Sequence, residues 1–337
     1  MVEGIRSMPS FVTFAKNVFI PVTNICRNNC GYCGFKRELN DPEAKLMTPQ
    51  EIAPILSKGK ELGCSEALFT FGECPEDVSG FSFLLEELGF SNYIDYIIYL
   101  CELAIESGLL PHTNAGIIDY NDLKRLGEVN SSLGLMLETT ANLPCHHDSP
   151  GKRPEKRVEV LKNAGKLRIP FTTGILVGIG ETRTDRINSL KVISQLHEQY
   201  GHIQEVIIQN FKPKIGTGME NKPNPKSSVM IDTVKLARDI LQDEIAVQVP
   251  PNLIEPRILI SAGATDLGGI SPETIDWINP ESSWPSVDRL QEMVGNDITL
   301  RERLPIHPQY IDKGWYSSKI AELITKLNFK GYKRIDS

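Results

Sequence analysis

Three cysteines on one short segment are the residues whose type and spacing point most directly to chemistry. Cys26, Cys30 and Cys33 follow the pattern C-x3-C-x2-C. Thiolates are soft ligands that suit zinc or iron–sulfur centres. A structural zinc site normally closes with four ligands, often as two separated pairs, and no second pair follows here. Three thiolates on a four-iron cube would instead leave one iron free to bind a small molecule. We therefore expect one 4Fe–4S cluster on these cysteines; a zinc loop and a chance cluster of buried cysteines are the alternatives.

The four other cysteines stand apart from this segment and from one another. Cys64 and Cys101 lie in helical patterns and are expected to be packed thiols. Cys74 and Cys145 lie in predicted loops. An odd total of seven cysteines, without a secretion signal in residues 1–10, argues against a disulfide framework. This cysteine usage predicts a protein of the reducing cytoplasm.

The overall composition is that of a globular protein with no electrostatic bias toward nucleic acid. The chain has 337 residues, 40% of them hydrophobic and 23% charged, with a net charge of −7. Nucleic-acid binding needs clustered Lys and Arg, and the densest basic group, residues 152–157, is interrupted by Pro154 and Glu155. We interpret most of these charges as a solvated surface. No run reaches the roughly 18 apolar residues that a membrane span requires, so neither a nucleic acid nor a membrane is an expected partner.

The elements that must position the cysteines are apolar strands that alternate with helical patterns. Strands are predicted at residues 18–22, 67–71, 109–113, 133–137, 171–177, 206–209 and 246–249, with an eighth near 265–267. Helices are predicted at residues 49–62, 94–107, 122–129, 154–164, 184–200 and 231–241, and less clearly at 256–261. Thr48 and Glu51 form a capping signal for the first of these helices.

This alternation predicts an α/β fold with a parallel sheet and right-handed crossovers. The number of units and the chain length favour a single (β/α) barrel, closed or partly closed, over an open sheet. The alternation fades from about residue 277, where prolines punctuate the sequence. We predict an N-terminal extension at residues 1–16, the barrel at 17–276, and a C-terminal extension at 277–337 that caps the barrel.

The cysteine segment directly follows the first predicted strand, at the end where a barrel places its chemistry. Tyr32 gives this segment the form C-x3-C-x-aromatic-C. It thereby resembles the defining loop of the radical S-adenosylmethionine (SAM) superfamily. The resemblance implies that the free iron chelates the amino and carboxylate groups of SAM. It also implies that reduction of the cluster cleaves SAM to a 5′-deoxyadenosyl radical.

Further positions resemble the SAM-binding residues of that superfamily, in barrel order. Gly72 and Glu73 end the second predicted strand like the family's GGE motif, which receives the SAM amino group, although Phe71 replaces its first glycine. Glu138 and Arg157 resemble the pair that holds the SAM ribose and carboxylate in the biotin synthase-like and hydrogenase-maturase-like branch. A carboxylate accepts hydrogen bonds from ribose hydroxyls, and a guanidinium matches a carboxylate.

Gly174 opens a segment, residues 174–181, that resembles the fifth strand lining the adenine side of the family's site. The resemblance thus implies SAM contacts from Tyr32, Gly72, Glu73, Glu138, Arg157 and Gly174. Taken singly, the charged residues also fit an ordinary surface, and a glycine-rich strand end also fits a simple turn. Their common order along the predicted barrel favours the SAM site.

Later segments resemble the deazaflavin-forming branch of the superfamily. They are residues 69–73, 208–211, 248–253, 266–272 and 284–290. The resemblance implies an enzyme that cyclises a hydroxybenzyl–ribitylaminouracil adduct to the 8-hydroxy-5-deazaflavin chromophore. It would release 5′-deoxyadenosine, methionine and ammonium. The reaction would therefore be that of an ammonia-releasing lyase or synthase.

A polyhydroxylated substrate of this kind needs neutral hydrogen-bonding groups around an apolar slot. Five residues at predicted strand ends are candidates: Asn114, Gln209, Asn210, Asn252 and Asp266. For each of them, a turn-forming or capping role is the alternative. The proline-rich C-terminal extension is a candidate lid that keeps water from the radical.

Three rival functions stand beside this prediction. One is the partner radical SAM enzyme of the same pathway, which joins a tyrosine fragment to the ribityl-uracil. Another is a menaquinone- or thiamine-pathway radical SAM enzyme, which fits the later segments less well. A rival of a different class is a non-catalytic scaffold that binds an iron–sulfur cluster or zinc. The predicted partners are the small-molecule substrate, a reductant protein for the cluster, and the partner radical SAM subunit.

Overall fold

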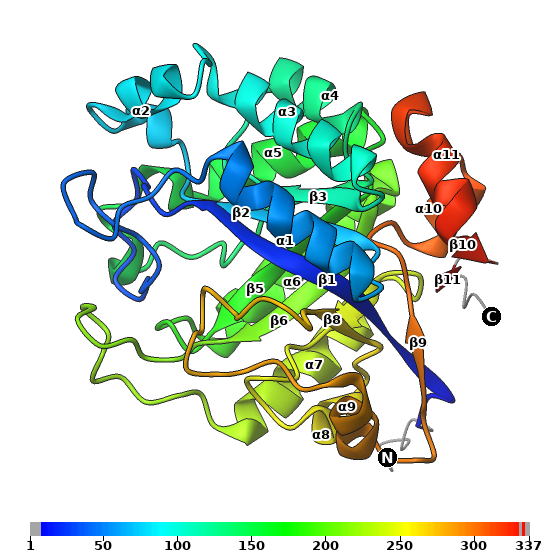
Figure 1. Ribbon diagram of the computed structural model, residues 1–337. Helices are drawn as coiled ribbons and strands as arrows, with labels where there is room; N and C mark the ends of the chain where they lie inside the picture. The colour runs from blue at the N-terminus through cyan, green and yellow to red at the C-terminus, as the bar shows by residue number, and fades with distance from the viewer. Residues whose placement is uncertain (1–7, 330–331, 334–337) are drawn as a thin grey trace.

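The computed structural model describes residues 8–329 and 332–333, and within these ranges eight parallel strands close into a barrel (Figure 1). The strands are β1 Phe11–Thr23, β2 Glu66–Phe71, β3 Leu110–Asn114, β4 Ser132–Gly134, β5 Phe171–Val177, β6 Ile203–Asn210, β7 Ala246–Gln248 and β8 Asp266–Ile270. Each strand pairs with the next, and β1 pairs with both β8 and β2. The predicted (β/α) barrel is therefore confirmed in its closed form.

Helices between the strands cover the outside of the barrel (Figure 1). They are α1 Pro49–Glu61, α2 Phe81–Glu87, α3 Tyr93–Glu106, α4 Tyr120–Gly127, α5 Pro154–Lys166, α6 Arg183–Tyr200, α7 Ser227–Ile240 and α8 Pro256–Ile260, with short 3-10 turns η1 Pro75–Asp77, η2 Pro144–His146 and η3 Pro150–Lys152. Helix α1 begins with the predicted capping box, in which Thr48 and Glu51 satisfy each other's backbone N–H groups. One large apolar core between helices and strands stabilises this arrangement.

Two strands differ from their predicted bounds for identifiable reasons. Strand β1 begins at Phe11, before the predicted start of the barrel, because residues 11–14 pair with a strand from the end of the chain. Strand β4 ends at Gly134, although the prediction extended it to Leu137. There the Thr173 hydroxyl donates to the Leu135 carbonyl (2.8 Å) and accepts from the Leu137 N–H (3.2 Å), which interrupts the backbone ladder. The domain boundaries remain predictions.

The C-terminal segment caps the barrel at the end opposite the cysteine loop (Figure 1). It contains α9 Val287–Val294, β9 Thr299–Glu302, α10 Pro308–Asp312, α11 Ser318–Leu327, β10 Asn328–Phe329 and β11 Tyr332–Lys333. Strand β9 extends the sheet beside β1. The Pro305 carbonyl accepts hydrogen bonds from Ser132 (2.7 Å) and Gln204 (2.9 Å), near the first residues of β4 and β6. The predicted cap thus closes the barrel floor.

Among the described residues, no helix combines the length and the apolar character needed to cross a membrane.

Candidate active site

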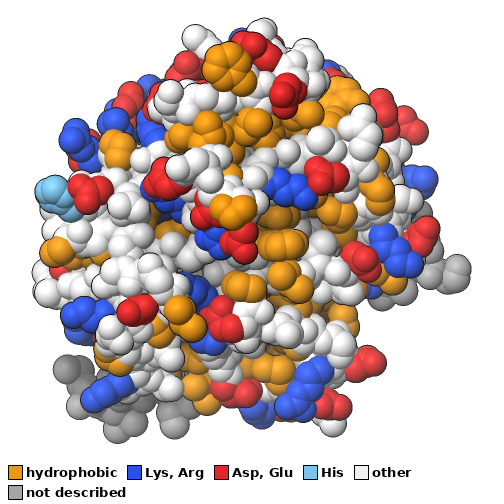
Figure 2. Space-filling model, turned by 60° about the vertical axis from the view of Figure 1, so that its left-hand side comes forward, with side chains coloured by type: hydrophobic (Ala, Val, Ile, Leu, Met, Phe, Trp, Pro, Cys, Tyr) orange, Lys and Arg blue, Asp and Glu red, His pale blue; other side chains and the backbone are white. Residues whose placement is uncertain are grey.

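A cavity of about 430 Å³ runs through the barrel from the cysteine loop toward the opposite end. Figure 2 brings the cysteine-loop side of the molecule forward and shows apolar side chains gathered over the middle of this face, with charged ones among them. Cys26, Cys30 and Cys33 all line the cavity, and all three are partly exposed free thiols. The predicted cysteine cluster therefore lies at the mouth of an internal cavity.

The end of β2 holds one side of the cysteine loop. The Gly72 N–H donates to the Thr23 carbonyl (2.7 Å), and the Glu73 N–H donates to Cys26 Sγ (3.2 Å). A Cβ atom on Gly72 would lie 1.9 Å from the Ile25 carbonyl oxygen, a distance that no side chain tolerates. Glycine is therefore required here so that the loop can approach the strand.

The segment after β4 holds the other side of the loop. The Gly31 N–H donates to the Cys145 carbonyl (2.8 Å), and the Gly151 N–H donates to Asn28 Oδ1 (2.9 Å). The Ser149 hydroxyl donates to Cys30 Sγ (3.3 Å). These contacts fix the positions of the thiols from two sides before any ligand binds.

Burial raises the pKa of the Cys26 thiol, partly offset by backbone hydrogen bonds. Burial also raises the pKa of the Cys30 thiol, partly offset by the charge of Lys152 and the hydrogen bond from Ser149. A bound positive centre would further favour the thiolate form of both side chains. Among the described residues, no three His, Cys, Asp or Glu side chains are grouped to hold a single metal ion.

Two buried ion pairs lie beside the thiols. Glu73 accepts hydrogen bonds from Arg157 Nη2 (2.9 Å) and Asn28 Nδ2 (2.7 Å). Arg157 also donates to the Met136 carbonyl, and its Nε has no hydrogen-bond partner in the described structure. Glu73, Arg157 and Asn28 are each less than a tenth exposed. This arrangement joins the end of β2, the cysteine loop and α5 through one carboxylate.

Glu138 forms the second pair, with Lys152. Burial raises the pKa of the Glu138 carboxyl, but Lys152 and Arg157 outweigh this effect and leave the pKa below its ordinary value. Glu138 has a φ of 66°, in the left-handed region that non-glycine residues rarely adopt. Such a conformation persists where surrounding structure enforces it, and it is often found at functional sites.

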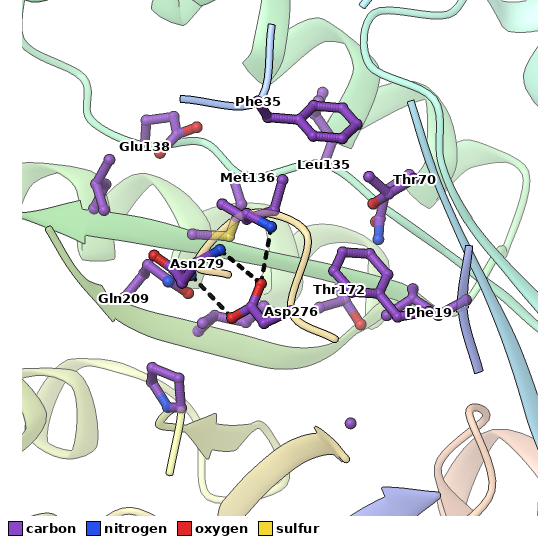
Figure 3. Close-up of a pocket in the computed structure, with 18 of the residues that line it drawn as sticks. Phe19, Phe35, Thr70, Leu135, Met136, Glu138, Thr172, Gln209, Asp276 and Asn279 are labelled. Carbon is purple, nitrogen blue, oxygen red and sulfur yellow. Dashed lines mark hydrogen bonds between the residues drawn. The ribbon is translucent and has the colours of Figure 1, made fainter. Parts of the chain in front are cut away.

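Eleven of the predicted site residues line this one cavity: Cys26, Cys30, Tyr32, Cys33, Gly72, Glu73, Asn114, Glu138, Arg157, Gln209 and Asn210. Figure 3 shows Glu138 and Gln209 at the cavity, together with Asp276 and Asn279 from the segment after β8. Both line the cavity, and Asn279 lies in the predicted C-terminal extension, so the first part of that extension contributes to the site. Asn114 is the last residue of β3, as the strand-end prediction requires.

Three predicted site residues are not among those lining the cavity. Gly174 lies within β5, where a Cβ atom would come 2.4 Å from the Ile207 carbonyl oxygen. Asn252 donates to Asp276 Oδ2 (2.9 Å), so it supports the segment that lines the mouth. Asp266 was predicted at the carboxyl end of a strand, and this placement is wrong, because it is the first residue of β8. Its carboxylate is buried against Arg303.

Comparison with known proteins identifies the family. The sequence model described as the Radical SAM superfamily matches residues 20–193, a range that begins within β1 and includes the cysteine loop. The chain belongs to the radical SAM superfamily. It is 58% identical over 324 residues to the 7,8-didemethyl-8-hydroxy-5-deazariboflavin synthase of Methanosarcina mazei, covering 96% of each chain. It is 60% identical over 328 residues to the protein of the same name from Methanococcoides burtonii, covering 97% of this chain and 99% of the relative.

A solved structure of another protein has the same fold. The FeFe-hydrogenase maturase HydG from Carboxydothermus hydrogenoformans aligns with a TM-score of 0.67 at 15% identity, covering 94% of this chain and 78% of HydG. At this level of identity the comparison supports the barrel alone. Membership of the superfamily implies a 4Fe–4S cluster and SAM as cofactors.

The residues present fit these radical SAM cofactors. Three thiols on one loop provide soft ligands for iron and leave no fourth cysteine on that loop. Arg157 is buried with an unpartnered Nε, and Gly72 supplies the close backbone approach beside Cys26. A buried polar atom without a protein partner leaves a hydrogen-bonding position open to a ligand or a water molecule.

Lys152 and Asn28 also line the cavity, although neither was predicted from the sequence. Lys152 belongs to the basic group that we interpreted as mostly solvated, but it lines the cavity and pairs with Glu138. Asn28 lies between the first two cysteines, and its position in the motif is the signal that could have identified it. Lys152 had no such signal, because its burial depends on the distant Glu138.

Proposed function

We propose that this protein is the radical SAM enzyme that cyclises a hydroxybenzyl–ribitylaminouracil adduct to the 8-hydroxy-5-deazaflavin chromophore. The reaction would release 5′-deoxyadenosine, methionine and ammonium. The observation that carries the proposal is the similarity, over nearly the whole chain, to proteins named 7,8-didemethyl-8-hydroxy-5-deazariboflavin synthase. The superfamily's cysteine loop at the mouth of an internal cavity supports it.

The cofactors would be held by residues of the mouth. Cys26, Cys30 and Cys33 would bind one 4Fe–4S cluster. Glu138 would accept hydrogen bonds from the SAM ribose, because Lys152 keeps its carboxyl ionised. Arg157 would face the SAM carboxylate with the guanidinium nitrogen that has no protein partner.

The remaining predicted SAM residues contribute shape and backbone groups. Gly72 and Glu73 would present the end of β2 to the SAM amino group, beside Tyr32 of the cysteine loop. Tyr32 is fixed by a hydrogen bond of 3.0 Å between its hydroxyl and His146 Nε2. Gly174 would leave room for the adenine side, where a larger residue would collide with Ile207.

When bound, the cluster and SAM would supply the radical chemistry that removes a hydrogen atom from the substrate. The protein's own residues would orient the substrate and exclude water. Asn114, Gln209 and Asn210 offer neutral hydrogen-bonding groups to the cavity, and the buried Asn210 Oδ1 has no partner in the described structure. Asn252 would act indirectly, by supporting the segment that carries Asp276. Asp266 would stabilise the barrel floor.

Reconstitution tests this function. Protein loaded with iron and sulfide under anaerobic conditions would be incubated with SAM, dithionite and the adduct. We expect a fluorescent deazaflavin and deoxyadenosine in equal amounts, and neither product from a Cys30→Ser control. Deoxyadenosine without deazaflavin would reject the substrate, and product from tyrosine plus diaminouracil would identify the partner enzyme's reaction. Iron loading without SAM cleavage would favour a scaffold.

We further propose the cellular setting in which this reaction would run. The cluster would receive electrons from a reductant protein in the cytoplasm. The adduct would come from the partner radical SAM subunit. A pull-down of that subunit with this protein measures whether the two enzymes form a stable complex. Repeating the pull-down after adding free adduct measures whether the adduct changes the amount of complex.

A further inference from the structure

The cavity continues below the thiols to a polar floor. The floor lies at the first residues of the strands, where Glu66 begins β2, and Arg303 and Pro305 close the barrel from below. His112 and Thr172 also line this part of the cavity. Glu66 precedes Gly72 by six positions on the same chain segment, which corresponds to roughly 20 Å of extended strand. A ligand that reaches both the thiols and the floor must therefore be elongated.

Arg303 is already satisfied by other carboxylates of the floor. Its Nε and Nη2 donate to the two oxygens of Asp266 (2.6 and 2.9 Å), and Nη2 also donates to Glu205 (3.0 Å). Arg303, Asp266 and Glu205 are each less than a twentieth exposed. Two of the three acidic side chains at the floor, Asp266 and Glu205, are therefore paired with Arg303. The third is Glu66.

Glu66 has no hydrogen-bond or ion-pair partner among the residues that the structure describes, although it is 5% exposed and lines the cavity. Asn17 is its register partner on β1, is 1% exposed, and has an Oδ1 atom without a donor. Buried polar groups are normally hydrogen-bonded, and leaving them unpaired is costly. Two neighbouring acceptors without donors therefore indicate a ligand that brings donors.

The middle of the cavity is apolar and lies between this floor and the charged mouth. Phe19, Leu68 and Ile207 line it. Figure 3 shows Phe19, Leu135 and Thr172 among the side chains around this space. Flat rings suit an apolar section, whereas a chain of hydroxyl groups suits acceptors. The order of the three sections matches a ligand with aromatic rings at one end and a polyol at the other.

We propose that Glu66 and Asn17 form a binding subsite for a neutral polyol, which under the proposed function is the ribityl chain of the adduct. The hydroxyl groups donate to the Glu66 carboxyl and to Asn17 Oδ1. An anionic group is disfavoured at the floor, since three acidic side chains face one guanidinium there. The unpaired acceptors are the evidence that a subsite exists. That its ligand is the ribityl chain rests on the proposed function.

Burial raises the pKa of Glu66 to about 7, with Arg303 acting in the opposite direction. Near neutral pH the carboxyl is therefore present in both forms, so it can accept from one hydroxyl and donate to another. The positions of Glu66 and Asn17 define the subsite. The ability of the Glu66 carboxyl both to accept and to donate suits hydroxyl groups, which also do both.

Glu66→Leu tests the subsite in the reconstituted holoenzyme. We expect at least a tenfold rise in KM for the adduct with little change in kcat. An analogue with an unbranched alkyl chain in place of the ribityl group should react equally with the variant and the wild type. The melting temperature should be no lower than that of wild type, because an unpaired buried carboxyl is removed. Glu87→Gln, an exposed carboxyl on α2, is the control and should change none of these values.

Several outcomes would overturn the subsite. Equal losses with adduct and analogue, or a lower melting temperature, would make Glu66 a structural residue. The variant and the wild type could instead react equally only with an analogue that lacks the substrate's phenol hydroxyl. That result would assign the floor to the phenol end of the ligand. A wild type that makes no deazaflavin rejects the proposed function separately. Calorimetric binding of the adduct then decides the subsite, which fails if Glu66→Leu binds as tightly as wild type.

Discussion

At the scale of single residues, the mouth of the cavity contains two carboxylates that are each held by a basic side chain lining the cavity. Glu73 pairs with Arg157 and Glu138 with Lys152, and all four side chains line the cavity. Each pair fixes a charged group that would otherwise be unpaired in a buried place. The pairs therefore prepare the site for a zwitterionic ligand before it arrives.

Lys152→Met tests whether the ion pair between Lys152 and Glu138 contributes to SAM binding. The variant leaves Glu138 without its ion-pair partner, so we expect SAM binding at least tenfold weaker, about 1.4 kcal/mol. Equilibrium dialysis of SAM against the reconstituted protein measures the change. Iron content should stay at the wild-type value. Lys162→Met, which removes an exposed lysine on the following helix α5, should bind SAM normally. Unchanged affinity in Lys152→Met would show that Glu138 needs no partner.

Residues within a local motif could be predicted from sequence, whereas residues whose role depends on distant contacts could not. The cysteines share one segment and follow a recognisable spacing. Lys152 and Glu66 carry no such local signal. Glu66 is the first residue of an apolar strand, and a charged residue at that position is typical of a solvent-exposed strand boundary. Its place at the cavity floor follows from barrel closure, which brings it beside Asn17.

At the scale of elements, the decisive contact is between the end of β2 and the cysteine loop. The loop crosses Gly72 so closely that a Cβ atom there would also come within 2.9 Å of Cys26 Cβ. Backbone hydrogen bonds from Gly72 and Arg27 join the same two segments. Strand β2 thus determines where the first thiol lies.

Gly72→Ala should displace the cysteine loop. The added methyl group cannot fit against the Ile25 carbonyl, so the loop must move and carry Cys26 with it. We expect less than a third of the wild-type iron after anaerobic reconstitution and a melting temperature lower by several degrees. Gly218→Ala is the matched control, since its nearest atom is 3.6 Å away on the same cysteine loop. Wild-type iron content in Gly72→Ala would contradict this account of the loop.

The barrel strands could be predicted because each is an apolar run bounded by turn residues. Their ends were less predictable where side chains or distant strands intervene. Thr173 ends the regular ladder of β4 by inserting its hydroxyl, an effect that lies on a neighbouring strand. The early start of β1 depends on pairing with β9, which is almost three hundred residues away. Neither effect leaves a pattern in the local sequence.

At the scale of the whole molecule, the end of the chain closes the barrel that its beginning opens. Arg303 reaches the interior from beside β9 and pairs with Asp266 of β8 and Glu205 of β6. Tyr310 and Ile320 of the same C-terminal segment form a separate apolar cluster with Leu110 of β3. The floor is therefore a junction between the barrel and the C-terminal segment, and its charges should influence the stability of both.

The pH dependence of stability should separate the paired floor carboxylate from the unpaired one. Burial raises the pKa of Asp266, but the charge and hydrogen bonds of Arg303 outweigh burial and lower this pKa to about 2, so its contribution to stability is lost only below about pH 4. The pKa of Glu66 is raised to about 7, so the folded protein binds more protons than the unfolded chain between about pH 4.5 and 7. Stability must therefore fall as the pH rises through that range, by on the order of 3 kcal/mol at most.

Glu66→Gln removes this titration, and calorimetric melting temperatures of the holoenzyme between pH 5 and 8 measure the result. The variant should gain several degrees relative to wild type as the pH rises, because wild type alone must ionise a buried, unpaired carboxyl. Asp266→Asn is the contrasting variant. It breaks a buried ion pair and should be destabilised by a similar amount at every pH in this range, since Asp266 stays ionised throughout. Parallel curves for wild type and Glu66→Gln would mean that Glu66 has the same proton affinity in the folded and unfolded chains, and its carboxyl would then have a partner at the floor.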